Sequence, residues 1–194
     1  MRERYEAPNQ YSWIVYAAAV IIVGGLAGYV LSLQGGQPSA SAGVPAAATA
    51  ATPIVDESEL RAYREILTRD PKNAQAAIKA GNLLYDAHRY VEAIGFYQQA
   101  FAVAPKDISL STDLGTALWY VGRADEALAQ YEKSLAIDAT HAQTLFNMGI
   151  VRSDGKHDYR GAIAAWETLL KTNPGYPEVM KVQSLIADAR KNVT

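Results

Sequence analysis

Three histidines are the residues in this chain best suited to acid–base catalysis or metal binding. His88, His141 and His157 lie in separate breaks between apolar stretches, so we expect them to be far apart in space. Asp154 and Asp158 flank His157, which makes this segment the strongest candidate for a metal-binding loop. Divalent sites need three or four converging ligands, and a solvent-exposed turn explains the same residues. We therefore predict no catalytic residue, no cofactor site and no metal site.

Composition and charge narrow the possible functions further. The chain has 194 residues, a formal net charge of −2 and no cysteine. Near-neutral charge argues against nucleic-acid binding, which normally needs a basic excess. The lack of cysteine removes disulfides and thiolate metal sites. Residues 7–55 contain no Asp, Glu, Lys or Arg, so nearly all charges lie in the C-terminal part.

The uncharged stretch Trp13–Leu33 predicts a transmembrane anchor helix. Its 21 residues span about 31 Å as a helix, close to the roughly 30 Å hydrocarbon core of a bilayer. Tyr11 and Tyr16 lie near its start, where aromatic rings favour the membrane interface. A cleaved signal peptide is the alternative, with a cleavage site at Ala40–Ala42. Signal peptides have apolar cores of only about 7–15 residues, so a retained anchor is favoured.

Basic residues predict the orientation of this anchor. Arg2 and Arg4 precede it, and no Lys or Arg follows until Arg61. The positive-inside rule then leaves residues 1–12 in the cytoplasm and exports the part that follows the helix. We expect a single-pass protein of a bacterial cytoplasmic (inner) membrane, with its C-terminal domain in the periplasm or exterior.

Small residues form a stripe on the predicted anchor. Gly24, Gly28 and Ser32 recur at every fourth position, which permits close approach of two membrane helices. This stripe predicts a homodimer formed through the anchor. Residues 34–55 are rich in Ala, Gly, Pro and Ser and predict a linker to a domain over residues 56–194.

A short sequence pattern recurs in this domain at a spacing of 34 residues. Four residue types of the segment Tyr90–Asp107 recur in Ala124–His141: Glu92, Ala93, Tyr97 and Ala102 return as Glu126, Ala127, Tyr131 and Ala136. Apolar positions in both segments follow the i, i+3, i+4 spacing of one buried helix face. Each unit reads as helix, turn, helix, and no pair buries its apolar face alone. We predict stacked units at about 74–107, 108–141 and 142–175.

From Asp56 to about Pro174 the pattern resembles the tetratricopeptide repeat (TPR) family, which has a 34-residue period. The family's small and aromatic helix-packing positions match Gly81, Gly115, Gly149, Ala93, Ala127, Ala162, Tyr97, Tyr131 and Trp166. The resemblance implies an all-α, right-handed superhelix of about three repeats. A leading half-repeat would contain Tyr63, and a capping helix would cover the last apolar surface at 176–190.

The third unit departs from the family pattern. Arg152 occupies a position that is usually tyrosine, and one extra residue lies between Gly149 and Ala162. We expect the first helix of this unit to end early, at Asp154–Gly155, with Arg152 partly exposed. The second unit has Ala139 where proline is usual.

The resemblance also implies a concave, partner-binding groove lined by the first helix of each unit. Its predicted lining is Ile78, Asn82, Tyr85, Thr112, Thr116, Trp119, Tyr120, Gln143, Phe146 and Ile150. Some relatives bind a peptide carboxylate there through Lys and Arg, but basic residues are absent from these positions. Trp119, Tyr120 and Phe146 are the expected strongest contacts with a peptide that has apolar anchors. The alternative is that Trp119 or Phe146 packs into the core.

Together these features predict a membrane-anchored adaptor, not an enzyme, that binds protein or peptide partners outside the cytoplasm. The layout resembles accessory TPR proteins of bacterial c-type cytochrome maturation. The alternative is a constitutive structural or accessory subunit of a membrane protein complex. Stoichiometric co-purification would favour the subunit, and transient peptide affinity would favour the adaptor.

Overall fold

The computed structural model describes residues 54–193, and these residues form helices and turns without a strand. The predicted anchor Trp13–Leu33, the small-residue stripe and nearly all of the linker lie outside the described residues. Among the residues described, no helix combines the length and the apolar character that a membrane crossing needs.

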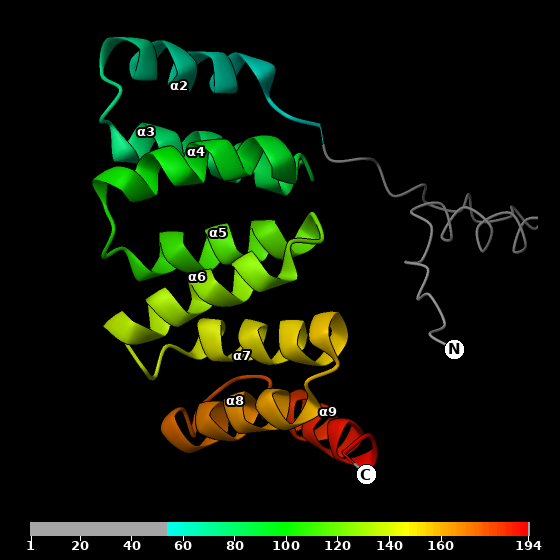
Figure 1. The fold of residues 1–194 in the computed structure, drawn as a ribbon. Coiled ribbons are helices and arrows are strands. Elements are labelled where there is room, and N and C mark those ends of the chain that lie inside the picture. Colours follow the sequence, from blue (N-terminus) through cyan, green and yellow to red (C-terminus); the bar gives the residue numbers. More distant parts are fainter. Residues whose placement is uncertain (1–53, 194) are drawn as a thin grey trace, which may run out of the picture. The chain divides into compact units, whose positions relative to one another are not determined.

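The described helices follow one another as antiparallel pairs that stack along the chain (Figure 1). The helices are α2 (Glu57–Arg69), α3 (Ala74–Asp86), α4 (Tyr90–Val103), α5 (Ile108–Tyr120), α6 (Ala124–Ile137), α7 (Ala142–Ile150), α8 (Tyr159–Thr172) and α9 (Val179–Lys191). A π-helical turn, η1 (Val151–Gly155), continues α7. The pairs α3–α4, α5–α6 and α7–α8 are the three repeats, and α2 is the leading half-repeat.

Short polar side chains start several of these helices. Asp56, Asn73, Asp107 and Asp158 each accept a hydrogen bond from a backbone N–H in the first turn of the helix that follows. Such caps satisfy amide groups that have no partner inside the helix. The repeat boundaries are therefore set locally as well as by packing.

Each repeat is held together by a ring that packs on a glycine. A Cβ added at Gly81 would lie 2.5 Å from Cε1 of Tyr97, and one at Gly115 would lie 2.5 Å from Cε1 of Tyr131. Trp166 covers Gly149 in the same way and donates a hydrogen bond from Nε1 to the carbonyl oxygen of Phe146. The facing alanines of the second helices, Ala93, Ala127 and Ala162, are fully buried. Only residues without a larger side chain allow the two helices to approach this closely.

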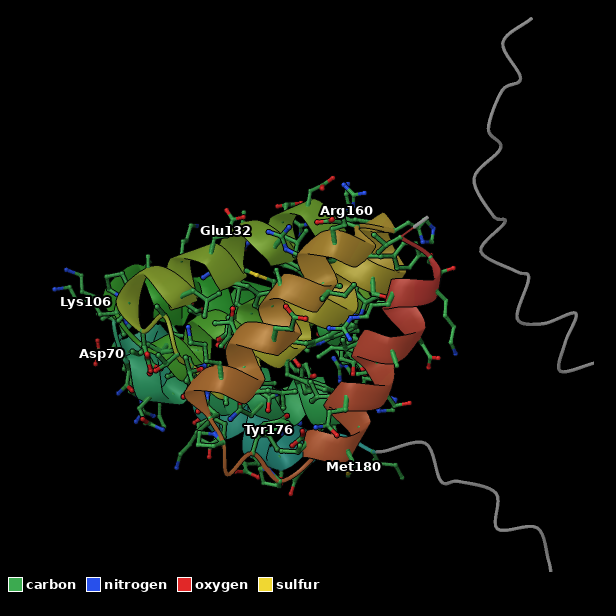
Figure 2. The ribbon with its side chains drawn as sticks, turned by 90° about the horizontal axis from the view of Figure 1, so that it is seen from below. Asp70, Lys106, Glu132, Arg160, Tyr176 and Met180 are labelled. Carbon is green, nitrogen blue, oxygen red and sulfur yellow. The ribbon has the colours of Figure 1, made fainter. Side chains whose placement is uncertain are left out.

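The last helix covers the open end of the stack. Val182, Ile186 and Ala189 of α9 are buried beside Trp166 and Leu169 of α8. Helix α9 begins at Val179, a few residues later than expected, because 174–178 form a turn that carries Tyr176. Figure 2 views the stack from this end, with Tyr176 and Met180 near the start of α9.

Two of the three histidines have a conformational role. His88 and His157 have φ angles of 59° and 53°, and Gly122 has a φ of 80°. All three residues lie in the turn between the two helices of a repeat, where the chain needs the left-handed conformation. Histidine is one of the few residues other than glycine that adopts it with some frequency. Each repeat has one such turn, which explains why these three residues lie in separate breaks of the sequence.

The extra residue of the third repeat lies in a widened helical turn. The helical segment ends at Gly155, where it was expected to end, but the regular α-helix stops at Ile150 and the π-helical turn Val151–Gly155 takes up the additional residue. A π turn closes a wider ring than an α turn and accommodates one inserted residue. Arg152 is partly exposed, as expected, and its Nη1 lies 2.8 Å from Oδ2 of Asp158.

Candidate functional site: the inner face

The first helices α3, α5 and α7 form one surface of the stack, here called the inner face, and a pocket opens on it between α5 and α7. The pocket has a volume of about 140 Å³. Seven residues line it: Thr116, Trp119 and Tyr120 of α5, Tyr131 of α6, and Phe146, Asn147 and Ile150 of α7. Five of the predicted groove residues therefore come together here: Thr116, Trp119, Tyr120, Phe146 and Ile150.

Trp119 is a wall of this pocket and also a packing residue. Its side chain is half-buried, and a Cβ added at Gly155 would lie 2.6 Å from its Cζ3 atom. The π-helical turn therefore packs against the indole. Trp119 both lines the pocket and packs against the buried core, so each of the two interpretations, groove residue and core residue, is partly right.

Phe146 forms the opposite wall and is also half-buried. The Nζ atom of Lys181 lies 5.0 Å from the centre of its ring, and the Tyr176 ring lies 6.2 Å away. Both neighbours come from α9 or the turn before it, so the capping segment closes this end of the inner face. A cation over an aromatic face is attracted to it, which fixes the Phe146 ring.

Polar groups form the floor of the pocket. The Tyr131 hydroxyl lies 3.0 Å from Oγ1 of Thr116, and Nδ2 of Asn147 donates to the same oxygen at 3.0 Å. Burial raises the pKa of Tyr131 to about 12, so its hydroxyl is neutral at physiological pH. The floor is therefore uncharged, with its hydrogen bonds already made, and the walls are apolar.

Thr112 is a correction to the predicted lining. Its side chain is only 2% exposed, because Oγ1 lies 2.7 Å from Oγ1 of Thr144 inside the α5–α7 contact. A buried residue of this kind joins neighbouring repeats and offers no surface to a partner. The other predicted positions are at least partly exposed: Ile78, Asn82, Tyr85 and Gln143 lie on the inner face outside the pocket.

A second aromatic cluster lies beside the pocket. The Tyr90 and Tyr120 rings stack with their centres 4.5 Å apart, and Tyr85 meets both rings edge-on. Tyr120 remains 54% exposed. The predicted lining omitted Tyr90 because it opens a second helix, although its place directly after the turn brings it next to the first helices.

Asp113 of α5 is a further candidate residue of the inner face, and the predicted lining omitted it. It is half-buried between the carboxylates of Asp86 and Asp107, and it forms none of the ion pairs of the described residues. Burial, and then the repulsion of these two carboxylates, raises the pKa of Asp113 to about 6. Helical spacing could have indicated that Asp113 lies on the inner face, because it precedes the predicted groove residue Thr116 by one helical turn.

This environment predicts that Asp113→Asn stabilises the protein in a pH-dependent way. An acid whose pKa rises from 3.8 to about 6 on folding makes the folded state bind more protons, so stability falls as pH rises through that window. After solvent screening is allowed for, the variant should gain about 1–2 kcal/mol over wild type at pH 7.5. The gain should vanish near pH 4. Urea unfolding of both full-length proteins at pH 4, 6 and 7.5 measures it, and a pH-independent difference would contradict the assignment.

The histidine and aspartate residues considered for metal binding have structural partners. Asp158 caps α8 through the Gly161 amide at 2.9 Å, and this hydrogen bond is the main cause that lowers the pKa of the Asp158 carboxyl. Nδ1 of His141 lies 2.7 Å from Oγ1 of Thr144. Within residues 54–193, no three His, Asp or Glu side chains are grouped so that they hold a metal ion.

Comparison with known proteins agrees with the repeat architecture. Residues 60–108 match the model of the tetratricopeptide repeat family. The chain is 32% identical over 102 residues to a probable UDP-N-acetylglucosamine–peptide N-acetylglucosaminyltransferase, SPINDLY, of Hordeum vulgare, covering 49% of this chain and 11% of that protein. It is 29% identical over 111 residues to Hsp70-Hsp90 organizing protein 1 of Glycine max, covering 57% of this chain and 19% of that protein. The chain thus spans a fifth or less of these relatives.

Solved structures show the same fold. The crystal structure of MamA superposes with a TM-score of 0.60 at 21% identity, over 69% of this chain and 81% of that one. The TPR domain of Arabidopsis OM64 gives a TM-score of 0.57 at 18% identity, over 62% of this chain and 96% of that domain. The described residues are therefore an all-helical, tetratricopeptide-type superhelix, and at these identities the likeness concerns fold alone.

Proposed function

We propose that this protein is a non-catalytic adaptor that holds a peptide segment of a partner protein on its inner face. The observation that carries the proposal is the pocket between α5 and α7, which has apolar walls, an uncharged floor and four aromatic residues in its lining. Pockets of this composition bind apolar anchor side chains, and buried aromatic residues dominate the energy of such contacts. The chain is similar to Hsp70-Hsp90 organizing protein 1, whose name refers to other proteins that it organises. This similarity supports an interaction role.

The proposal is tested with displayed random 12-residue peptides selected on the full-length protein. Each enriched peptide is then measured by fluorescence anisotropy against wild type and a Trp119 variant. The proposal requires peptides that carry an apolar anchor and lose affinity when Trp119 is truncated. A set of enriched peptides that are all indifferent to Trp119 would contradict it.

We further propose that residues 13–33 anchor the adaptor in a bacterial inner membrane, with the repeats on the outer side. The 21-residue uncharged stretch and the two arginines before it support this arrangement. Within it, assembly or maturation of c-type cytochromes is the narrower role that the layout of anchor, linker and small repeat domain favours. A dimer through Gly24, Gly28 and Ser32 is compatible with both.

The topology leads to a direct prediction. Alkaline phosphatase fused after Thr194 should be active, because this enzyme folds only after export from the cytoplasm and the positive-inside rule exports the C-terminal part. Moving the two arginine charges to the far side of the helix, as Arg2→Gln and Arg4→Gln with Gln34→Arg and Gln37→Arg, should lower that activity. A fusion that is active only with a cytoplasmic reporter would contradict the orientation.

A further inference from the structure

Two carboxylates on the inner face have no cationic partner. Asp86 ends α3 and is exposed, and Asp113 of α5 is half-buried near it. None of the ion pairs within residues 54–193 involves either residue. No Lys or Arg of residues 54–193 thus forms an ion pair with these two carboxylates.

Two lysines that border the inner face, Lys79 and Lys181, form no ion pair with Asp86 or Asp113. Lys79 of α3 lies near Asp86, but its Nζ is 6.0 Å from the centre of the Tyr63 ring on α2. Lys181 pairs with Glu178 at 2.6 Å and lies over Phe146, at the opposite end of the pocket. The surface therefore has a negative end next to α3 and a neutral, apolar pocket next to α7.

The negative end and the pocket lie within one helical turn of each other. Asp113 precedes Thr116 by three residues on α5, and residues with this spacing are neighbours on a helix surface, with Cβ atoms about 5–6 Å apart. A ligand side chain in the pocket therefore brings its own neighbours within reach of Asp113. Two subsites of different chemistry, one apolar and one anionic, are presented side by side.

We propose that the inner face selects peptides that carry a lysine or arginine within about four residues of an apolar anchor. The anchor enters the pocket between α5 and α7, and the cation pairs with Asp113 and Asp86. This inference rests on the proposed adaptor function and specifies that the bound segment of the partner carries a positive charge. Charge complementarity across an interface chooses among partners and rejects those of like charge, so acidic segments and free C-terminal carboxylates are excluded.

An unpaired, half-buried carboxylate is a cost to the fold that a binding role explains. Desolvation and two neighbouring carboxylates oppose the ionised form of Asp113. A ligand cation supplies the missing partner and removes this cost on binding. Groups that weaken a fold without a compensating contact are expected at functional sites.

The test is a double-mutant cycle on the full-length protein. The probe is the enriched 12-residue peptide, compared with an analogue in which its basic residue is norleucine, which keeps the chain length and removes the charge. Wild type should bind the analogue about tenfold more weakly, whereas Asp113→Asn should bind both peptides equally. Asp86→Asn should give a smaller effect in the same direction. Glu65→Gln, an exposed carboxylate of α2 that lines neither the pocket nor the negative end, should behave as wild type.

The outcomes separate this inference from the function on which it rests. Peptides that depend on Trp119 but are neutral or acidic would overturn the inference and leave the adaptor function in place. An equal loss for the analogue in wild type and Asp113→Asn would also overturn it. Peptides that are all indifferent to Trp119 would overturn both. Because Asp113→Asn is expected to stabilise the fold, unfolding does not account for a loss of affinity in this variant.

Discussion

Gly115→Leu is expected to lower the stability of the full-length protein by about 3 kcal/mol or more. A Cβ at this position would lie 2.5 Å from Cε1 and 2.8 Å from Cδ1 of Tyr131, which is itself fully buried. Overpacking of a rigid core costs about 1–3 kcal/mol and more when the neighbour has no room to move. Tyr131 also holds Thr116 in the pocket floor, so its displacement should disturb the inner face as well. Urea unfolding at pH 7.5 measures the effect.

The matched control is Gly95→Ala on α4. Gly95 is also a helical glycine, but nothing lies within 4 Å of an added Cβ there. Alanine favours helix over glycine by about 1 kcal/mol, so this variant should be slightly more stable than wild type. Equal stability of Gly115→Leu and wild type would contradict the ring-on-glycine packing and the repeat register that depends on it.

Trp119→Ala is expected to weaken binding of a selected peptide about thirtyfold. Truncation of a central aromatic contact costs about 2 kcal/mol or more of binding free energy, which corresponds to that factor. The pocket would lose the largest side chain of its lining, to which Trp119 and Phe146 both contribute. Stability should fall as well, since the indole also covers Gly155. Anisotropy titrations at 20 °C therefore accompany thermal unfolding of the same variant, so that loss of affinity is separated from loss of folded protein.

Phe101→Ala is the control for the fold. Phe101 is a half-buried aromatic residue of α4 that contacts the core, with Nζ of Lys133 5.8 Å from its ring centre. It lies between second helices and lines no part of the pocket, so its loss should lower stability and leave peptide affinity unchanged. If both variants weaken binding equally, the indole acts through stability and the pocket is not the site.

Helix positions and the main packing residues were accessible from the sequence, because each repeats every 34 residues. Gly81, Tyr97, Gly115 and Tyr131 were recognised as packing positions through the family resemblance, whereas the contact of each ring with the glycine of its own repeat is seen only in the structure. The fate of the extra residue in the third repeat was not accessible. A longer connecting loop and a widened helical turn both accommodate an insertion, and the sequence does not say which one forms; in the structure Val151–Gly155 is the widened turn, and Trp119 packs against Gly155.

The candidate site was accessible only in part, for reasons of tertiary structure. Thr112 has the spacing of a surface position, but a hydroxyl of the next repeat, that of Thr144, lies against it and covers it. Asp113 becomes notable through its burial first, and then through the nearby carboxylates of Asp107 and Asp86. Burial of this kind depends on how the repeats pack together, and helical periodicity within one element does not reveal it.

Methyl NMR of the full-length protein, labelled at the isoleucine δ1 carbons and titrated with a selected peptide, tests the central claim most directly. Ile150 lines the pocket, whereas Ile137 is 42% exposed at the end of α6 and lies outside it. The account predicts that saturation with peptide shifts the Ile150 methyl signal and leaves that of Ile137 in place, and that Trp119→Ala abolishes the shift at the same peptide concentration. A shift at Ile137 with Ile150 unchanged would show that the partner binds the opposite surface of the stack.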